Sequence, residues 1–419
     1  MPPHPRRRSA GYAALTAGAS VFLAACSKDV PNTTLTPHTD LGRDIDALFD
    51  ILLWGGVIVF MLVAIGLLYV VFRYRHKPGD PEPKQIHGST VLEITWTLIP
   101  ALVLAFIAVP TVRTIFATQQ PPPADALQVE VIGHQWWWEF RYPESNVVTA
   151  NELFLPTNRT VHFTLRTADV IHSFWIPQLG GKRDLITNRT NHIVLTTDST
   201  PTMAWNGFCA EYCGSSHANM RFRVFTVPPD AFEEWLTHQA SGPVTVAGGA
   251  AAQAVVQADT TPADTTPADT SAAPVPVAPA PGLPRAFDLV AEYARLPHIR
   301  PSTPLPDMPF TVTAGDAARG SELFRASPCI ACHVVQGVSP GIVGPNLTHV
   351  GSRTTIGAGL YPNDFQHLTR WIKNAMALKA MNYPQGQGMP PMGAGLPNAM
   401  AAYDDQQIAD LAAYLLSLK

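Results

Sequence analysis

The sequence has few charged residues and few cysteines. Asp, Glu, Lys and Arg make up only 14% of its 419 residues and 46% are hydrophobic, which favours a membrane component. The net charge of −4 gives no reason to expect a nucleic acid as partner. The length predicts two or three domains. Each of the five cysteines lies in a motif, so none is left over for a structural disulfide: Cys26, Cys209, Cys213, Cys329 and Cys332.

Two long runs are almost free of charge. Ile51 to Phe72 has no charged side chain and Val91 to Val112 has only Glu93, so each run can cross the roughly 30 Å hydrocarbon layer as a helix. The basic residues between them are Arg73, Arg75, Lys77 and Lys84. Short loops rich in Lys and Arg stay in the cytoplasm. We therefore predict a two-helix transmembrane hairpin over residues 47–117, with everything after about Thr114 outside.

The N-terminus has the pattern of an export signal. Arg6 to Arg8 precede an apolar run from Tyr12 to Ala25, which predicts a signal peptide over residues 1–25. Leu23-Ala-Ala-Cys26 resembles the bacterial lipoprotein cleavage box, in which the cysteine is lipidated and becomes the new N-terminus. Residues 26–46 would then form an external segment. Cleavage by the ordinary signal peptidase, with Cys26 incidental, is the alternative.

The stretch from Cys209 to Met220 gathers soft metal ligands. It contains Cys209, Cys213, His217 and Met220, which can meet at one point only if the segment folds as a loop. Thiolate, imidazole and thioether together suit copper. A small-loop disulfide and a zinc site remain open, although zinc sites seldom use methionine. A second histidine would have to come from elsewhere in the chain.

Residues 125–237, which contain this stretch, are predicted to form β structure. Short runs rich in Val, Ile, Thr and Phe, such as Leu127 to Ile132, Thr160 to Arg166 and His192 to Thr196, are separated by Asn, Gly, Pro and Asp. This spacing predicts an antiparallel β-sandwich or barrel. Beyond it, residues 238–310 form a linker. Ala, Pro, Thr and Val dominate as far as Pro284, with Thr-Thr-Pro-Ala-Asp repeated at Thr260 and Thr265, which predicts a disordered tether, and Arg285 to Pro309 shows only some helix-like apolar spacing.

The last segment, residues 311–419, contains a haem attachment motif. Cys329-Ile-Ala-Cys332-His333 matches C-x-x-C-H, in which two thiols form thioethers to haem c and the histidine binds iron. A thioredoxin-like redox pair is disfavoured because no βαβ pattern surrounds it. Helices are expected over Ala317–Ala326 and Asp404–Leu418. The second places four residues on one face, Ile408, Leu411, Ala412 and Leu415.

The pattern C-x-E-x-C-G-x-x-H-x-x-M resembles the binuclear copper (CuA) loop of cytochrome c oxidase subunit II. The resemblance implies a cupredoxin-like sandwich in which Cys209 and Cys213 bridge two coppers. It also implies that His217 and an upstream histidine each bind one copper. Asp169 to Trp175 resembles the strand that carries the upstream ligand, which assigns His172.

The same resemblance assigns weaker ligands and one departure. Met220 would be a weak ligand and Glu211 would give its backbone carbonyl, with its carboxylate directed at a magnesium site facing the partner subunit. The family often has Gln before the first cysteine, where this chain has Phe208. Because that residue is not a ligand, the metal assignment stands and the local hydrogen bonding is what changes.

Two further stretches resemble this family. Glu93 lies in E-x-x-W-T-x-x-P, whose glutamate marks the mouth of a proton channel in the partner subunit; an interfacial carboxylate reaching water is the alternative. G-H-Q-W-x-W carries at its first tryptophan, here Trp136, the ring through which electrons enter the copper site. Trp137 and Trp138 are expected to be packing residues or part of an aromatic belt at the membrane surface.

The last domain resembles a small class I cytochrome c. Gly344-Pro345-Asn-Leu347 matches the turn whose proline carbonyl holds the proximal imidazole. Met389-Pro390, after a Gly-rich loop and before the last helix, matches the family pattern for the sixth iron ligand, with Met392 as the second candidate. A methionine is more often core filler than a ligand.

Together these features predict a multidomain membrane protein with a transmembrane hairpin, an all-β cupredoxin-like sandwich and an all-α class I cytochrome c domain. The resemblance implies the electron-input subunit of a bacterial cytochrome c oxidase, in the plasma membrane with its metal domains outside. Electrons would pass from an external donor, such as cytochrome c or a quinol-oxidising complex, through haem c and CuA to haem a of subunit I, and subunit III would be a further partner. The alternatives are the copper subunit of a nitric oxide reductase and a membrane-tethered relay or copper carrier without an oxidase.

Overall fold

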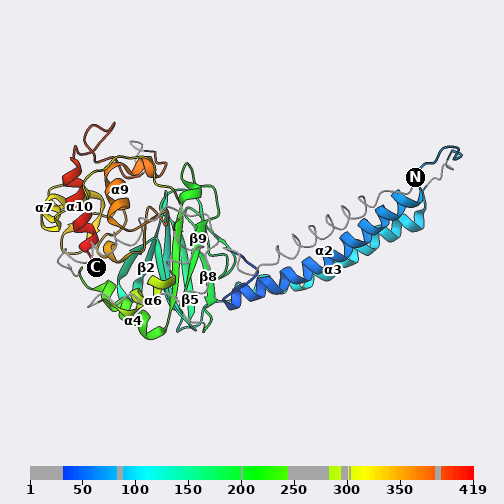
Figure 1. The fold of residues 1–419 in the computed structure, drawn as a ribbon. Coiled ribbons are helices and arrows are strands. Elements are labelled where there is room, and N and C mark those ends of the chain that lie inside the picture. The colour runs from blue at the N-terminus through cyan, green and yellow to red at the C-terminus, as the bar shows by residue number, and fades with distance from the viewer. Residues whose placement is uncertain are drawn as a thin grey trace, which may run out of the picture.

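The computed structural model describes residues 32–82, 88–199, 202–243, 283–293, 301, 303–382 and 388–419. Two long helices project from a pair of β-sheets, and a helical C-terminal domain lies on the far side of the sheets (Figure 1). The expected signal peptide, Cys26 and most of the expected tether fall outside the described residues.

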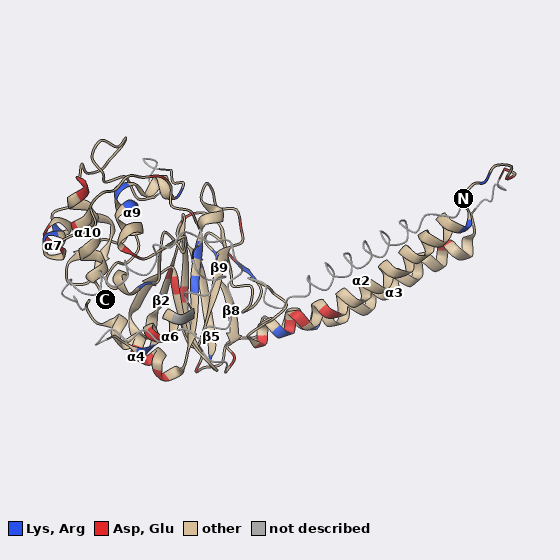
Figure 2. Cartoon of the chain, viewed as in Figure 1, with Lys and Arg blue, Asp and Glu red and all other residues tan. Residues whose placement is uncertain are grey.

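The two long helices are α2 (Asp40–Arg73) and α3 (Thr90–Ala117), and they run side by side. Thr39 begins α2, because its side chain accepts a hydrogen bond from the backbone N–H of Gly42. The helix therefore starts eleven residues before the uncharged run, and its acidic residues gather at the end nearest the sheets (Figure 2). The rest of both helices presents apolar side chains outward, as a lipid environment requires.

Two five-stranded sheets form the central domain, in the orders β3-β2-β1-β5-β8 and β4-β10-β9-β6-β7. Their strands are β1 (Leu127–His134), β2 (Trp137–Tyr142), β3 (Val147–Ala150), β4 (Glu152–Pro156), β5 (Thr160–Thr167), β6 (His172–Trp175), β7 (Arg183–Leu185), β8 (Asn191–Thr196), β9 (Met203–Cys209) and β10 (Arg221–Val227). Buried and partly exposed residues alternate along β1 and β5, which places one face of that sheet in the core.

The expectation of a purely antiparallel arrangement is wrong for two strand pairs. β1 pairs with β5 in parallel, and β4 pairs with β10 in parallel. The chain leaves the first sheet after β3 and builds β4 into the second before it returns as β5. Because of this path, β5 runs in the same direction as β1. The alternation of hydrophobic residues along the strands does not predict that direction.

Aromatic rings fill the space between the sheets. Phe174 stacks on Phe222 with ring centroids 5.0 Å apart, and Trp138 lies 5.3 Å from Phe222. At one end, α4 (Pro229–Ala240) inserts Trp235 against Phe154. The helix α6 (Arg285–Tyr293) packs on α4 and lies in the part of the linker whose apolar spacing is helix-like.

In the described residues of the C-terminal domain, the elements are short helices, two-residue strands and a 3-10 turn: α7 (Ala317–Arg325), α8 (Cys329–Cys332), α9 (Phe365–Leu378), α10 (Asp405–Ser417), β11 (Val334–Val335), β12 (Ser339–Pro340), β13 (Thr355–Ile356), β14 (Tyr361–Pro362) and η3 (Val350–Ser352). The helices α7 and α10 cross closely at Gly320, where a side chain would lie 2.0 Å from the carbonyl oxygen of Asp410. Arg319 bonds Asp410 across this crossing at 2.9 Å. The four residues predicted on one face of α10 are all buried.

Candidate metal centres

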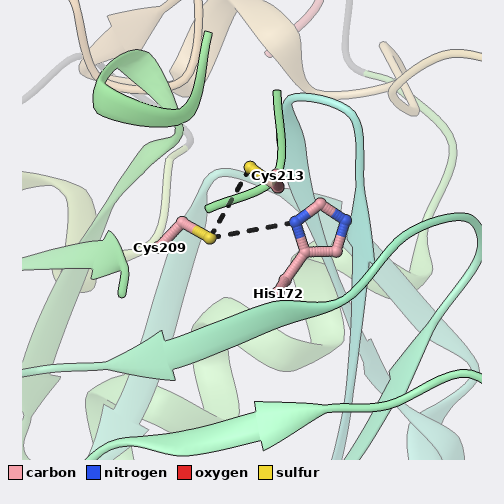
Figure 3. A group of neighbouring side chains, drawn as sticks. All are labelled: His172, Cys209 and Cys213. Carbon is pink, nitrogen blue, oxygen red and sulfur yellow. Dashed lines mark hydrogen bonds between the residues drawn. The ribbon is translucent and has the colours of Figure 1, made fainter. Parts of the chain in front are cut away.

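The copper loop, Cys209 to Met220, folds around a cluster of soft donor atoms. Cys209 ends β9, and His172 begins the neighbouring strand β6 (Figure 3). The sulfur atoms of Cys209 and Cys213 lie 3.8 Å apart, and Nδ1 of His172 lies 3.8 Å from Cys209 Sγ. Nδ1 of His217 lies 3.6 Å from Cys213 Sγ, and Met220 Sδ lies 3.7 Å from the same sulfur.

Local hydrogen bonds hold the loop in this shape. The backbone N–H of Cys209 donates to the carbonyl of Met220, which closes the loop at its base. Gly214 has a φ of +114°, which side-chain-bearing residues rarely adopt, and a side chain there would lie 3.0 Å from the ring of Trp136. The indole Nε1 of Trp136 in turn donates to the Cys213 carbonyl at 3.0 Å.

The two thiols share their protons unequally. The hydrogen bond between the two sulfurs lowers the pKa of Cys209 and raises that of Cys213. The pair therefore loses a first proton more readily than a second. A sulfur separation of 3.8 Å is far longer than the roughly 2.05 Å of a disulfide bond, so the disulfide alternative does not describe this structure.

His172 is oriented by a carboxylate. Its Nε2 lies 2.8 Å from Oδ1 of Asp169, and Asp169 also accepts from the backbone N–H of Gln135 at 2.7 Å. Burial alone would lower the pKa of His172, but the hydrogen bonds to Asp169 and Cys209 outweigh it and raise that pKa. Asp169 thus fixes the ring so that Nδ1 faces the sulfurs, the arrangement found around metal-binding histidines.

The donor set fits a pair of soft metal ions. Three of its members, His172, Cys209 and Cys213, are buried and place their donor atoms within 4.8 Å of one another. The carbonyl oxygen of Glu211 adds a further donor 3.2 Å from Cys209 Sγ. His172 lies beside Cys209 and His217 beside Cys213, so the two thiols and two imidazoles would together supply the soft ligands for such ions.

The three adjacent tryptophans have different environments. Trp138 is fully buried in the aromatic core, and Trp137 stacks on His134 with ring centroids 4.1 Å apart. Trp136 is 3% exposed and contacts the copper loop. Trp138 is therefore a packing residue, which is one of the two roles expected for it.

The haem motif forms a short helical turn with a fixed histidine. His333 lies directly after α8, and its Nδ1 donates to the Pro345 carbonyl at 2.9 Å, which leaves Nε2 for a metal. A side chain on Gly344 would lie 2.6 Å from the His333 ring, so only glycine permits this approach. Both thiols are free and partly exposed, as attachment to vinyl groups requires.

The methionines of this domain occupy different positions. Met389 is partly buried against the core of the C-terminal domain, and Met392 is buried within it. Met400 is 43% exposed, whereas Met381 packs against the core of the central domain. The backbone N–H of Met389 donates to the sulfur of Met381 at 3.2 Å, which occupies the Met381 thioether.

The C-terminal domain docks directly on the copper loop. Lys379, at the end of α9, donates from Nζ to the carbonyl of Trp136 at 2.5 Å. Ser216 of the copper loop donates to the Ala380 carbonyl at 2.5 Å. Burial lowers the pKa of Lys379 to about 7, so its charge is sensitive to this contact. The sequence gives no signal for this contact, because Trp136 lies 243 residues before Lys379.

A second contact lies at the edge strand β4. The buried carboxylate of Glu152 accepts from the backbone N–H groups of Thr354 and Thr355, at 2.8 and 3.0 Å, and from both of their hydroxyls. Burial raises the pKa of Glu152 despite these bonds. Arg223 donates to the Gly359 carbonyl at 3.3 Å beside it. The two domains therefore meet through specific polar contacts and not only through the chain that connects them.

Comparison with known proteins agrees with this architecture along the whole chain. The family model "Cytochrome C oxidase subunit II, transmembrane domain" matches residues 37–114, the corresponding periplasmic domain matches residues 145–227, and "Cytochrome c" matches residues 317–419. "Cytochrome c oxidase subunit 2" of Alkalihalophilus pseudofirmus is 31% identical over 413 residues, which cover 96% of this chain and 94% of that protein. The chain belongs to the cytochrome c oxidase subunit II family. It carries the family's copper domain with a cytochrome c domain fused at its C-terminus.

Other relatives share part or all of this arrangement. The subunit 2 of Bacillus subtilis is 28% identical and covers 91% of this chain, whereas a quinol oxidase subunit 2 of Bacillus cereus covers 52%. A solved structure of the periplasmic domain of subunit II from Bradyrhizobium japonicum is 29% identical, covers 28% of this chain and 95% of its own, and has a TM-score of 0.26. Membership of the family makes the chain part of a terminal oxidase, and implies copper and haem c as its cofactors.

Proposed function

We propose that this subunit II is the electron-input subunit of a bacterial haem-copper oxidase, which receives electrons at its cytochrome c domain and delivers them to subunit I for oxygen reduction coupled to proton pumping. The observation that supports it most is the docking of the haem motif's domain on the copper loop, within one chain. When bound, haem c and the CuA pair supply reversible one-electron transfer. The protein's part is to hold both groups rigidly and close together.

At the copper site we propose Cys209 and Cys213 as bridging ligands, with His172 and His217 as terminal ligands. Met220 would be the weak thioether ligand, on the support of its 3.7 Å distance to Cys213 Sγ. The Glu211 carbonyl completes the set, and its carboxylate would reach a magnesium ion at the contact with subunit I.

At the haem site we propose thioether bonds from Cys329 and Cys332 and iron ligation by His333. The Pro345 carbonyl would hold the ligating ring, on the support of the 2.9 Å hydrogen bond to Nδ1. We propose Met389 as the sixth ligand. A thioether in this position raises the reduction potential relative to a second histidine, which suits an electron carrier.

We propose that Trp136 receives electrons from the tethered cytochrome and not from a free one. Its ring is buried, its indole bonds the Cys213 carbonyl, and Lys379 of the C-terminal domain bonds its own carbonyl. A domain joined by a tether competes at an effective concentration that a diffusing partner rarely reaches. The external donor would then meet the outward surface of the C-terminal domain.

The membrane arrangement proposed for the chain is a hairpin with both ends outside. Both described long helices are long and apolar enough to cross a bilayer. The domain limits proposed from the sequence place this hairpin at residues 47–117, the copper domain at 125–237 and the cytochrome domain at 311–419. A lipid on Cys26 would add a second anchor, and Glu93 would lie at the cytoplasmic end, at the mouth of a proton channel in subunit I.

The test is to express the chain with its neighbouring membrane subunits, purify it through a C-terminal tag and identify the large subunit that comes with it. We expect a haem-copper subunit I, with subunit III, and a complex that consumes oxygen. Cys213→Ser should abolish the paired-copper electron spin resonance signal and oxygen consumption while the subunits still copurify. Turnover of nitric oxide in place of oxygen would assign the chain to a nitric oxide reductase, and isolation without any large subunit would leave a tethered relay.

A further inference from the structure

A pair of imidazoles lies on the outer face of the first sheet, away from the copper loop. His162 is on β5 and His192 is on the neighbouring strand β8, in diagonal register, and their ring centroids are 5.0 Å apart. Nε2 of His162 lies 2.9 Å from Nδ1 of His192. His192 is exposed and His162 partly exposed, so the two facing nitrogens can be reached from solvent.

A third side chain fixes the tautomer of this pair. Gln128 on β1, directly beside His162 in the strand register, places its Oε1 2.7 Å from Nδ1 of His162. The amide oxygen can only accept a hydrogen bond, so Nδ1 of His162 carries the proton, and Nε2 presents a lone pair toward Nδ1 of His192. Fixing one ring nitrogen in this way is how proteins prepare the other for a metal.

Burial, and then the neighbouring His192, lowers the pKa of His162, which favours its neutral ring. In the tautomer of His192 that carries the proton on Nε2, Nδ1 has a lone pair. A metal ion can then take the place of the hydrogen bond between Nε2 of His162 and Nδ1 of His192.

The nitrogen separation discriminates between metal geometries. With metal–nitrogen bonds of about 2.0–2.1 Å, two nitrogens 2.9 Å apart subtend an angle of about 90° at the ion. A tetrahedral ion such as Zn²⁺ would need a separation of about 3.3 Å at the same bond lengths. An angle of 90° suits tetragonal Cu²⁺, which also binds imidazole more tightly than the other divalent first-row ions.

We propose that His162 and His192 form a second copper site, which binds one Cu²⁺ through two imidazoles with water in the remaining positions, and that Gln128 positions His162 for it. This site is separate from the copper loop, since it lies on β5 and β8 of the first sheet and the loop joins strands of the second. It gives the copper domain a place to hold oxidised copper on its outer surface.

The experiment titrates Cu²⁺ alone into the full-length chain already loaded with haem and with the copper pair. We expect one additional copper per chain by equilibrium dialysis, with a tetragonal electron spin resonance signal showing two imidazole nitrogens. His162→Ala should abolish this additional signal, while the copper-pair signal remains and reports a folded domain. His76→Ala removes a single exposed imidazole from the loop after α2 and should leave the titration unchanged.

Two variants of Gln128 keep the test decisive if the histidine variant fails to fold. Gln128→Leu should weaken Cu²⁺ binding by roughly 10- to 100-fold, the usual effect of losing the partner of a ligating histidine, and Gln128→Glu should restore it. Equal binding by wild type and His162→Ala would overturn the proposal and leave the pair as a hydrogen bond between neutral rings. Tighter binding of Zn²⁺ than of Cu²⁺ would also overturn it.

Discussion

Two of the proposed metal-binding histidines, His172 and His333, have the second ring nitrogen occupied, but the partners differ in charge. Asp169 gives His172 a carboxylate at 2.8 Å, whereas Pro345 gives His333 a carbonyl at 2.9 Å. A carboxylate makes the ring a stronger electron donor than a carbonyl does. His172 is therefore the more basic of the two rings, since its pKa is raised by the hydrogen bond to Asp169 and that of His333 is lowered by burial.

The sixth haem ligand is tested by removing its thioether. Met389→Ala should abolish the weak long-wavelength absorption band of sulfur-bound ferric haem, and the reduction potential should fall because a thioether no longer stabilises the reduced iron. Absorption spectroscopy and redox titration of the purified chain measure both. Met392→Ala is the matched control and should retain the band. If the band survives in Met389→Ala and disappears in Met392→Ala, Met392 is the ligand.

At the scale of elements, the sequence predicts where helices and strands occur better than it predicts where they begin and end or which strands pair. Runs of apolar residues locate α2 and α3, but Thr39 extends α2 well before its uncharged stretch. Alternating residues indicate β1 and β5, while their parallel pairing depends on the chain visiting the second sheet between them. Periodicity is local, and strand partnership is decided by contacts between distant segments.

The first turn of α3 gives a test of proton transfer. Glu93 lies there with an exposed side chain, at the helix end that we propose to be cytoplasmic. Glu93→Gln should slow proton uptake by the assembled oxidase and leave reduction of the copper pair unchanged, because the amide cannot exchange a proton. Stopped-flow measurements with a pH indicator follow both steps. Glu82→Gln, in the exposed loop, should change neither, and equal slowing of both steps in Glu93→Gln would contradict the assignment.

At the scale of the whole molecule, three parts of the chain meet at two histidines, the half-buried His238 and the buried His349. His238 of α4 lies against Phe287 of α6 and against His349 of the C-terminal domain, with ring centroids 5.7 and 4.8 Å away. Neither ring nitrogen of His238 has a partner among the described residues, and His349 donates from Nε2 to the Ser241 carbonyl. The docked arrangement therefore requires His238 to be neutral.

Acid should loosen this docking. Burial lowers the pKa of His238 to about 4 in the docked state and also lowers that of His349, whereas exposed rings take up protons near 6.5. Docking is thus strongest above pH 6.5 and weakens as pH falls toward 4, by at most roughly tenfold per pH unit for each ring. The rate of haem-to-copper electron transfer after flash reduction of the isolated chain measures it. His238→Phe keeps the packing and should flatten the profile, and an unchanged profile would contradict this role.

The contacts between domains are the part that the sequence does not predict. The copper ligands Cys209 to Met220 and the haem motif are short patterns, so their chemistry can be recognised without a fold. Glu152 and Thr354, or Trp136 and Lys379, are separated by about half the chain, and no local pattern links them. His162 and His192 become neighbours only through the register of β5 and β8.

Trp136 is buried and its carbonyl accepts from Lys379, so this contact constrains the evolution of such a subunit. A soluble electron donor that approached the copper loop directly would compete with the fused C-terminal domain for the same surface. Selection for a new reductant can therefore act on the solvent side of the C-terminal module alone. The geometry around the sulfurs of Cys209 and Cys213 need not change. The surface of the C-terminal domain can therefore vary while the copper loop stays constant.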